Sequence, residues 1–212
     1  MPDPAALPVC WFVMRIIAGH FRSRSLDAPK GMATRPSSDR LRETLFNVLA
    51  PRIEGASFLD LYAGSGSVGI EALSRGAARV AFVERAPAAL RALRGNLASL
   101  GIASGIRIDS SSVAAFLRRA STSTIPEWPE AAFREQYEVL YLDPPWDAAT
   151  EYATTLGLLG GSASGLLADG ALVIAEHRRK HQLEDRYGAL ERTRLLEQGD
   201  AALSFYTSRR ML

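Results

Sequence analysis

The chain has 212 residues, of which 47% are apolar and 23% charged, proportions that suit one globular domain with a sizeable core. Its single cysteine, Cys10, excludes a disulfide framework and a cysteine-based zinc site, and it fits a reducing cytoplasm. Residues 14–52 carry eight basic against three acidic residues, and residues 177–212 carry eight against five, whereas residues 53–176 carry nine against fourteen. Basic ends around an acidic body favour a polyanionic partner and a merely solvated surface about equally.

The first thirteen residues lack the basic start and the long apolar run of a signal peptide or membrane span. We therefore expect residues 1–13 to be a disordered leader, and the protein to be cytoplasmic with no membrane partner. Residues 14–52 are predicted to form an N-terminal appendage that faces RNA, with short strands at 15–18 and 25–26 and then a helix. This helix should begin at residues 36–38, with Ser37 or Ser38 as its N-cap, and bury an apolar face formed by Leu41, Leu45, Phe46 and Leu49.

From residue 53 to residue 212 strand-like and helix-like segments alternate, which predicts one further domain. Strand-type runs lie at residues 58–63, 80–84, 106–108, 139–142 and 172–175, and helical segments precede or follow them. This alternation predicts an α/β fold whose mainly parallel sheet is covered by helices on both faces. Two further runs, residues 192–196 and 201–207, flank Gly199-Asp200 and predict a C-terminal antiparallel hairpin. Residues 121–135, rich in Ser, Thr, Pro and acidic residues, are interpreted as a surface loop.

A glycine-rich turn follows the first of these strands, in the sequence Asp60-Leu61-Tyr62-Ala63-Gly64-Ser65-Gly66-Ser67-Val68-Gly69. Its glycines allow a tight turn beside a helix N-terminus, and Glu84 ends the next strand, where an acid can accept hydrogen bonds from ribose hydroxyls. The glycine spacing matches the dinucleotide fingerprint, so an NAD(P) oxidoreductase is one interpretation. Asp60 favours a cationic ligand such as S-adenosylmethionine instead, because a carboxylate at the strand end would repel a pyrophosphate. A third interpretation is that Asp60 and the glycines serve only the turn.

The sequence Asp143-Pro144-Pro145-Trp146 follows another apolar strand and should emerge at the same sheet edge as the glycine loop. Because proline fixes φ and lacks an N–H, the two prolines should hold a rigid turn. The Asp143 carboxylate and the Pro144 carbonyl can accept the two hydrogens of an exocyclic base amine, and Trp146 offers a flat face to a displaced base. Alone, the motif also fits a structural turn with a packed aromatic. Together with the glycine loop it predicts methyl transfer to a base amine, accelerated by positioning and electrostatics.

Both motifs resemble those of amino-methyltransferases that act on adenine N6, cytosine N4 or guanine N2. Residues 15–19 and 34–47 narrow the resemblance, because both are similar to the bacterial 16S rRNA guanine-N2 methyltransferase family, the RsmD-like proteins. The similarity extends over residues 14–209. It implies a Rossmann-like fold, S-adenosylmethionine as the methyl donor, residues 53–212 as the catalytic domain and a guanine of 16S rRNA, free or in an assembling small subunit, as the target. We expect a monomer.

The resemblance also implies roles for individual residues. It places Asp143, Pro144, Pro145 and Trp146 at the reaction centre. It also places nine residues beside the methyl donor, namely Asp60, Tyr62, Ala63, Gly64, Ser65, Gly66, Glu84, Arg85 and Asp109. Of these, Tyr62 is expected to pack rather than react, and Asp109 stands where the family has an acid-plus-alanine pair that this sequence lacks. Candidates for contacts with rRNA phosphates are Arg22, Arg24, Arg35, Arg40 and Arg42.

Several residues and segments stay outside these roles. Arg40 and Arg42 could instead pair with Asp39 or Glu43 on the helix surface. The side chains of Glu176, His177 and His181 are interpreted as structural or exposed, and no metal site is expected. Residues 1–13 and 121–135 have no obvious counterpart in the family.

Two other functions stay open at this point. A DNA adenine-N6 or cytosine-N4 methyltransferase shares the Asp-Pro-Pro-Trp motif, but such an enzyme would ordinarily carry a separate target-recognition region, and no segment is long enough for one. A non-catalytic RNA-binding assembly factor would also fit the basic ends. The intact Asp143 and the intact glycine loop argue against that factor.

Overall fold

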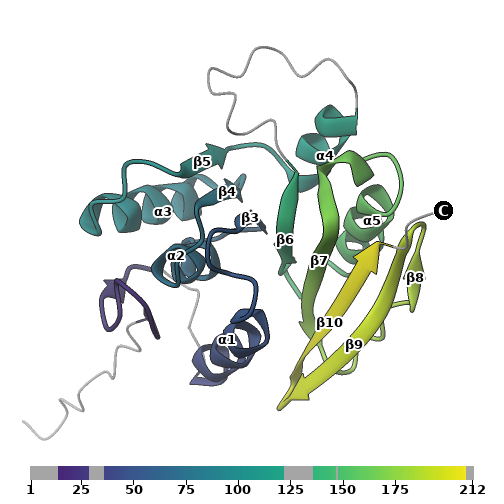
Figure 1. Cartoon of the computed structure of the whole chain (residues 1–212), viewed down its shortest axis with the longest axis horizontal. Coiled ribbons are helices and arrows are strands. Elements are labelled where there is room, and N and C mark those ends of the chain that lie inside the picture. The colour runs from purple at the N-terminus through teal and green to yellow at the C-terminus, as the bar shows by residue number, and fades with distance from the viewer. Residues whose placement is uncertain (1–13, 29–35, 122–135, 147, 209–212) are drawn as a thin grey trace, which may run out of the picture.

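A computed structural model describes residues 14–28, 36–121, 136–146 and 148–208, except for the side chains of residues 36–38. Its centre is an eight-stranded sheet (Figure 1). The strands of this sheet are β3 (Ser57–Leu61), β4 (Arg79–Val83), β5 (Ile106–Asp109), β6 (Tyr137–Leu142), β7 (Leu167–Arg178), β8 (Arg186–Tyr187), β9 (Leu190–Gln198) and β10 (Ala201–Ser208). Their order across the sheet is β5-β4-β3-β6-β7-β10-β9-β8.

The strands β5, β4, β3, β6 and β7 run parallel, and β10, β9 and β8 extend the sheet in antiparallel pairings. The predicted mainly parallel α/β fold is therefore confirmed, and so is the C-terminal hairpin, in which Ala201 pairs with Gln198. The chain passes from β3 through β4 to β5 and then crosses back to β6, on the other side of β3. Strand order thus reverses between β3 and β6, and ligands of open α/β sheets bind at such a reversal, outside the carboxyl ends of the strands.

Helices cover both faces of the sheet (Figure 1). They are α1 (Pro36–Leu49), α2 (Ser67–Ser74), α3 (Pro87–Ser99), α4 (Val113–Ser121), α5 (Ala149–Leu159) and the short 3-10 helix η2 (Ser164–Leu166). Because side chains alternate along a strand, Phe58 of β3 packs with α1, α2 and α3, whereas the adjacent Leu59 packs with α4 and α5. Within the described residues, no helix has the length and apolar character that a membrane crossing requires.

Helix α5 was not predicted. Its sequence contains three threonines and a glycine, which are poor helix formers. Tyr152, Leu156 and Leu159 nevertheless recur at helical spacing and are buried, so this periodicity could have revealed the helix. The predicted leader, and all of the predicted loop except Ser121, lie outside the described residues.

The N-terminal hairpin consists of β1 (Met14–Arg15) and β2 (Ser25–Leu26), so its first strand ends at residue 15 and not at residue 18 as predicted. The N–H of Ile17 donates to Oε2 of Glu71 at 2.7 Å, and the N–H of Ala18 donates to Oε1 at 3.0 Å. Glu71 belongs to α2, is fully buried, and also pairs with Nε of Arg75 at 2.7 Å. One buried carboxylate therefore supplies the acceptors that a partner strand would otherwise provide.

The turn that follows Ala18 is attached to the C-terminal end of α2. The N–H of His20 donates to the carbonyl of Ser74 at 2.7 Å, and the N–H of Phe21 donates to Oγ of Ser74 at 3.0 Å. Gly19 has φ +84°, and a Cβ at this position would lie 1.8 Å from the Ser74 carbonyl oxygen. Only glycine allows so close an approach.

The described residues among 14–52 contribute to the core of the sheet, and they do not form a separate apolar cluster. Ile16 of the hairpin and Phe46 of α1 are buried in the same apolar cluster as Phe58 of β3. Oγ1 of Thr44 in α1 also lies 3.0 Å from Oε1 of Gln198 in β9. The division into an appendage, residues 14–52, and a catalytic domain, residues 53–212, remains a prediction. The packing indicates that the two parts would fold as one unit.

We predict that Glu71→Ala lowers the free energy of unfolding by about 3–5 kcal/mol, because it leaves the partly buried Arg75 guanidinium without its carboxylate and two amides without acceptors. Urea denaturation measures this change. Hydrogen exchange at the amides of Ile17 and Ala18 should accelerate more than exchange at Leu59. Glu54→Ala, which removes an exposed carboxylate, is the control and should leave both measurements nearly unchanged. Wild-type stability in Glu71→Ala would contradict the proposed anchoring.

Candidate active site

Polar side chains gather at the carboxyl ends of β4, β3 and β6. Glu84 directly follows β4, Asp60 lies one residue before the end of β3, and Asp143 directly follows β6. Strands β3 and β6 are adjacent and parallel, with Leu61 opposite Leu142. The expectation that the glycine loop and the Asp-Pro-Pro-Trp sequence emerge at one sheet edge is therefore confirmed, and this edge is the point where strand order reverses.

Asp60 is almost completely buried, with 1% of its surface exposed. Its Oδ2 accepts a hydrogen bond from the N–H of Gly69 at 2.9 Å, and no described residue donates to its Oδ1. Burial raises the pKa of Asp60 to about 7, opposed by the Gly69 hydrogen bond and reinforced by the negative charge of Glu84. A cation placed beside this carboxylate would favour its ionised form. Asp60 is therefore suited to a positively charged ligand.

The glycine loop is closed by Glu84. The N–H of Gly64 donates to Oε2 of Glu84 at 2.8 Å, and the N–H of Ala86 donates to Oε1 at 2.7 Å. Gly64 has φ +57°, and no described atom lies within 4 Å of the place where its Cβ would stand. The loop thus borders open space at Gly64. Since each carboxylate oxygen can accept more than one hydrogen bond, Glu84 can still accept from hydroxyl groups. This arrangement fits the adenosyl group and the cationic amino-acid end of S-adenosylmethionine.

The other residues predicted beside the donor have different surroundings. Ala63 is buried, and its N–H donates to the carbonyl of Val83 at 3.0 Å. The hydroxyl of Tyr62 lies 2.8 Å from Oε2 of Glu151 and 2.7 Å from Oγ1 of Thr155, so the ring extends toward α5. Arg85 is exposed. The donor contacts of these residues remain predictions.

Asp109 ends β5 and is held by local hydrogen bonds. Its Oδ1 accepts from the N–H of Ser111 at 3.0 Å and from its hydroxyl at 2.5 Å, and its Oδ2 accepts from Arg119 at 2.8 Å. Burial raises the pKa of Asp109, but the hydrogen bonds from Ser111 and Arg119 lower it more, so the net shift is downward. Both oxygens support the turn into α4. A contact of Asp109 with the donor adenine remains a prediction.

Asn96 of α3 was missed by the sequence reasoning. Its Nδ2 donates to the carbonyls of Ser65 and Asp27, each at 3.0 Å, and its Oδ1 accepts from the N–H of Asp27 at 2.8 Å. One buried side chain thus connects the glycine loop to the segment that follows the N-terminal hairpin. A polar residue between Leu93 and Leu97, on the buried face of a helix, is the signal that could have identified it.

The Asp-Pro-Pro-Trp sequence forms a turn in which the carbonyl of Pro145 accepts from the N–H of Ala148 at 2.8 Å. Pro144 is buried and Pro145 is exposed. The guanidinium of Arg178, at the end of β7, lies 4.8 Å from the centre of the Trp146 ring. Such a cation–π contact fixes the orientation of the ring.

Asp143 is half-buried and belongs to a group of carboxyl side chains. Desolvation raises the pKa of Asp143 well above its usual range, and the negative charges of Glu176 and Asp60 raise it further. Glu176, interpreted from the sequence as structural or exposed, is half-buried, and its Oε2 accepts a hydrogen bond from the hydroxyl of Tyr141 at 2.5 Å. Burial raises the pKa of Glu176 as well, although the Tyr141 hydrogen bond and the charge of Arg42 oppose this. Shifted carboxyl groups in one cluster are typical of catalytic sites.

Two of the predicted phosphate contacts, Arg22 and Arg40, are exposed side chains. Arg24 is also exposed, and its guanidinium donates to the carbonyl of Ser99 at 3.0 Å. Arg35 lies outside the described residues. The three described arginines are therefore accessible to a polyanion, as their predicted role requires.

The alternative that Arg42 pairs with Asp39 is confirmed, and its burial makes Arg42 wrong as a candidate for phosphate contact. Its side chain is only 6% exposed, because it packs between α1 and the hairpin. It donates to the carbonyl of Arg15 at 2.6 Å and to Oδ1 of Asp39 at 3.0 Å, and its Nε lies 4.0 Å from Oε2 of Glu71. The sequence does not reveal Glu71 as a partner, because the two residues meet only through the docking of α1 beside α2.

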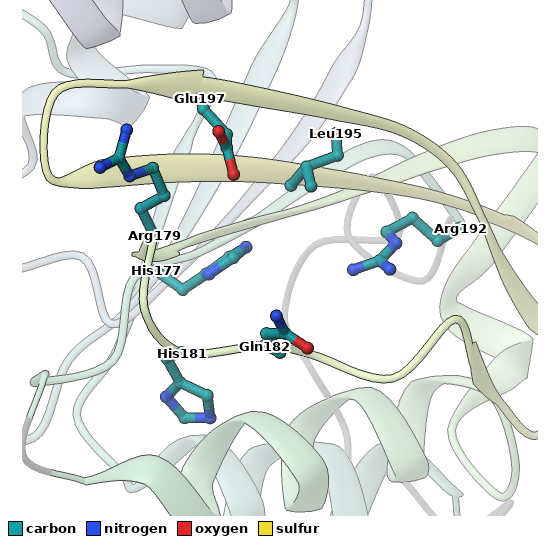
Figure 2. A pocket seen from close by; sticks show the side chains of 7 residues that line it. All are labelled: His177, Arg179, His181, Gln182, Arg192, Leu195 and Glu197. Carbon is teal, nitrogen blue, oxygen red and sulfur yellow. The ribbon is translucent and has the colours of Figure 1, made fainter.

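A pocket opens beside the C-terminal hairpin and contains none of the residues predicted for the site. Figure 2 shows side chains of β9 facing those of the segment after β7 across this pocket. Its lining consists of His177, Arg179, His181, Gln182, Arg192, Leu195 and Glu197. Nε2 of His177 lies 2.9 Å from Oγ of Ser204, which indicates a structural role. Within the described residues, no cluster of His, Cys, Asp and Glu side chains could hold a metal ion.

Comparison with known proteins adds independent information. Residues 14–207 match the family model described as Conserved hypothetical protein 95. The ribosomal RNA small subunit methyltransferase D of Escherichia coli K12 is 39% identical over 163 residues, which cover 77% of this chain and 74% of that protein. The Bacillus subtilis protein YlbH is 33% identical over 196 residues, or 92% of this chain and 100% of that protein. The solved structure of Escherichia coli yhhF aligns with a TM-score of 0.77 at 33% identity, covering 92% of this chain and 98% of that one.

We predict that Asp60→Asn is more stable than the wild type at pH 8 but not at pH 4. The folded protein holds the Asp60 proton up to about pH 7, above the pKa of an unfolded aspartate, so the wild type loses stability as the pH rises through this interval. The asparagine variant should gain about 2–4 kcal/mol at pH 8, measured by urea denaturation. Asp200→Asn, at an exposed carboxylate, is the control. If the free energies of unfolding of Asp60→Asn and the wild type differed by the same amount at both pH values, ionisation of Asp60 would be disproved as the cause.

Proposed function

Because the chain belongs to the family described as Conserved hypothetical protein 95, the family of the ribosomal RNA small subunit methyltransferases D, we propose that it methylates the exocyclic N2 amine of a guanine in 16S rRNA. The methyl donor in this proposal is S-adenosylmethionine. The place of action is the cytoplasm, on 16S rRNA or the assembling small subunit. The observation that carries the proposal is the convergence of Asp60 and Asp143 where strand order reverses.

The donor would lie along the glycine loop. S-adenosylmethionine, when bound, supplies an electrophilic methyl group. Asp60, buried and with one oxygen to which no described residue donates a hydrogen bond, would hold the amino group of the methionine part. Glu84 would accept hydrogen bonds from the ribose, and the open space at Gly64 would admit the donor close to the backbone. Donor and target would then meet at the ends of β3 and β6.

The target amine would be held by the Asp-Pro-Pro-Trp turn. The lone pair of an exocyclic amine is delocalised into the ring, so the amine is a weak nucleophile. The carboxyl group of Asp143 and the carbonyl of Pro144 would accept its two hydrogens, which favours a more pyramidal nitrogen in the transition state. The amine proton becomes acidic as the methyl group is transferred. Asp143, whose pKa is raised by burial and neighbouring carboxylates, could then accept this proton.

The guanine would be displaced from its stack to reach this turn, since pairing would occupy one of the two amine hydrogens that Asp143 and Pro144 accept. Trp146, fixed by the cation–π contact with Arg178, would present a flat surface to the displaced base. The exposed side chains of Arg22, Arg24 and Arg40 would contact RNA phosphates. The first two lie on the hairpin that Glu71 anchors, so the RNA-facing part would be rigidly joined to the catalytic core.

Mapping of methylated nucleotides tests this proposal. In a strain that lacks the gene, 16S rRNA should lose one N2-methylguanine, and expression of the wild-type protein should restore it. Asp143→Ala should fail to restore it, with a methylation rate in vitro reduced by about 10²-fold or more. Calorimetry should show nearly unchanged donor affinity for this variant, because Asp143 is assigned to the amine. Asp200→Ala is the matched control with full activity. An unchanged methylation pattern in the deletion strain would refute the proposed function.

The proposed RNA contact of the hairpin predicts a change in salt dependence. Replacement of both Arg22 and Arg24 by alanine should weaken RNA binding and reduce the slope of log K against log salt by about 1.5, because two phosphate contacts are lost. Arg186→Ala, on the edge strand β8, is the control and should leave the slope unchanged. Filter binding over a range of salt concentrations measures both. An unchanged slope in the double variant would remove the hairpin from the RNA interface.

A further inference from the structure

Asp143 has a second carboxyl group beside it that the proposed mechanism does not use. In the pairing of β6 with β7, Leu142 lies opposite Ala175, so the residues that follow them, Asp143 just after β6 and Glu176 near the end of β7, lie side by side. Side chains alternate along strands, and Leu142 and Ala175 both face the core formed with α4 and α5. Asp143 and Glu176 therefore both face the opposite side, which α1 and α2 cover.

Glu176 is held in a defined orientation with one oxygen available. The hydroxyl of Tyr141 donates to Oε2 at 2.5 Å, and Tyr141 itself is buried, with 3% of its surface exposed. No described residue donates to Oε1, and part of the Glu176 side chain remains exposed. The buried guanidinium of Arg42, in α1, favours the ionised form of this carboxyl group. An oriented acceptor thus stands next to the group assigned to the target amine.

The three bases that carry an exocyclic amine differ in the atom next to it. Guanine has the N1–H donor beside its N2 amine, whereas adenine has the N1 lone pair beside N6 and cytosine has the N3 lone pair beside N4. A carboxylate next to the amine-binding group would accept a hydrogen bond from guanine and would repel the ring nitrogen of adenine or cytosine. Discrimination by hydrogen bonds on this edge is typical of enzymes that act on displaced bases.

We propose that Glu176 selects guanine, by accepting a hydrogen bond from N1–H through Oε1 while Asp143 holds the neighbouring N2 amine. This inference rests on the proposed function and assigns the choice of base within the same site. It also gives Tyr141 a positioning role, because its hydroxyl determines which oxygen of Glu176 remains free.

A base analogue tests Glu176 directly. Small-subunit particles would be reconstituted with 16S rRNA that carries either guanosine or 2-aminopurine riboside at the mapped position. 2-Aminopurine keeps the amine but has a lone pair at N1 in place of the N1–H. Single-turnover rates for the wild type should favour guanosine by about 10²-fold or more, since a site built to accept a hydrogen bond rejects the analogue that lacks it. Glu176→Gln, whose amide can donate to N1, should lower this ratio at least about tenfold.

Two further variants complete the experiment. Glu184→Gln changes an exposed carboxylate and should leave the ratio at its wild-type value. Tyr141→Phe should lower the ratio, because Glu176 loses its fixed orientation. If calorimetry shows that Glu176→Gln does not bind the donor, the ratio measured for Tyr141→Phe decides the test. The inference would be overturned if Glu176→Gln kept the wild-type ratio of guanosine rate to 2-aminopurine rate, even with slower methylation of both particles. It would also be overturned if the wild-type protein methylated the two bases at equal rates. The proposed function would survive either result, whereas a wild type that left the guanosine particle unmethylated would contradict the proposed function itself.

Discussion

The reversal of strand order between β3 and β6 is the constraint on which the site depends. Because β4, β3, β6 and β7 run parallel, their carboxyl ends meet at one edge and bring together Glu84, Asp60, Asp143 and Glu176. Burial raises the pKa of Asp60, Asp143 and Glu176, and neighbouring negative charges raise it further for Asp60 and Asp143, so these carboxyl groups destabilise the folded protein when they ionise. A cationic donor and an amine with acidic hydrogens are the ligands that would relieve this repulsion. The sheet topology thus places several carboxyl groups at one edge, and the ligands of the proposed reaction would stabilise their ionised forms.

The described part of the N-terminal segment is connected to this site by hydrogen bonds. Glu71 fixes the hairpin through Ile17 and Ala18, and Asn96 joins the chain after the hairpin to the glycine loop. Arg42 lies within 4.0 Å of Glu71, and its charge acts on Glu176. Helix α1 therefore stands between the hairpin and the reaction centre. Contacts of RNA with the hairpin would be transmitted through packed, hydrogen-bonded elements, which is what accurate placement of a base requires.

Local patterns allowed the fold class and the centre of the site to be predicted. The alternation of strands and helices indicated a parallel sheet, and the chain order of Asp60 and Asp143, each at the end of an apolar strand, indicated that they meet at one edge. Helix α5 was overlooked, because threonine and glycine weaken the helical pattern. Arg42 was misassigned, because an arginine on a helix looks the same in sequence whether it faces solvent or a buried carboxylate.

By itself, the sequence determined the kind of fold, the two motifs and the chemistry to which their residue types are suited, since these depend on short-range spacing. Only the tertiary structure decided which side chains meet. The two backbone amides that donate to Glu71 lie more than fifty residues away in the chain, and Tyr141 and Glu176 are 35 residues apart. Periodicity predicts which face of a helix or strand a residue occupies, but it does not predict which residues of other elements pack against that face. The neighbours that orient Glu176 follow from the register of β6 with β7, which is set by packing across the whole sheet.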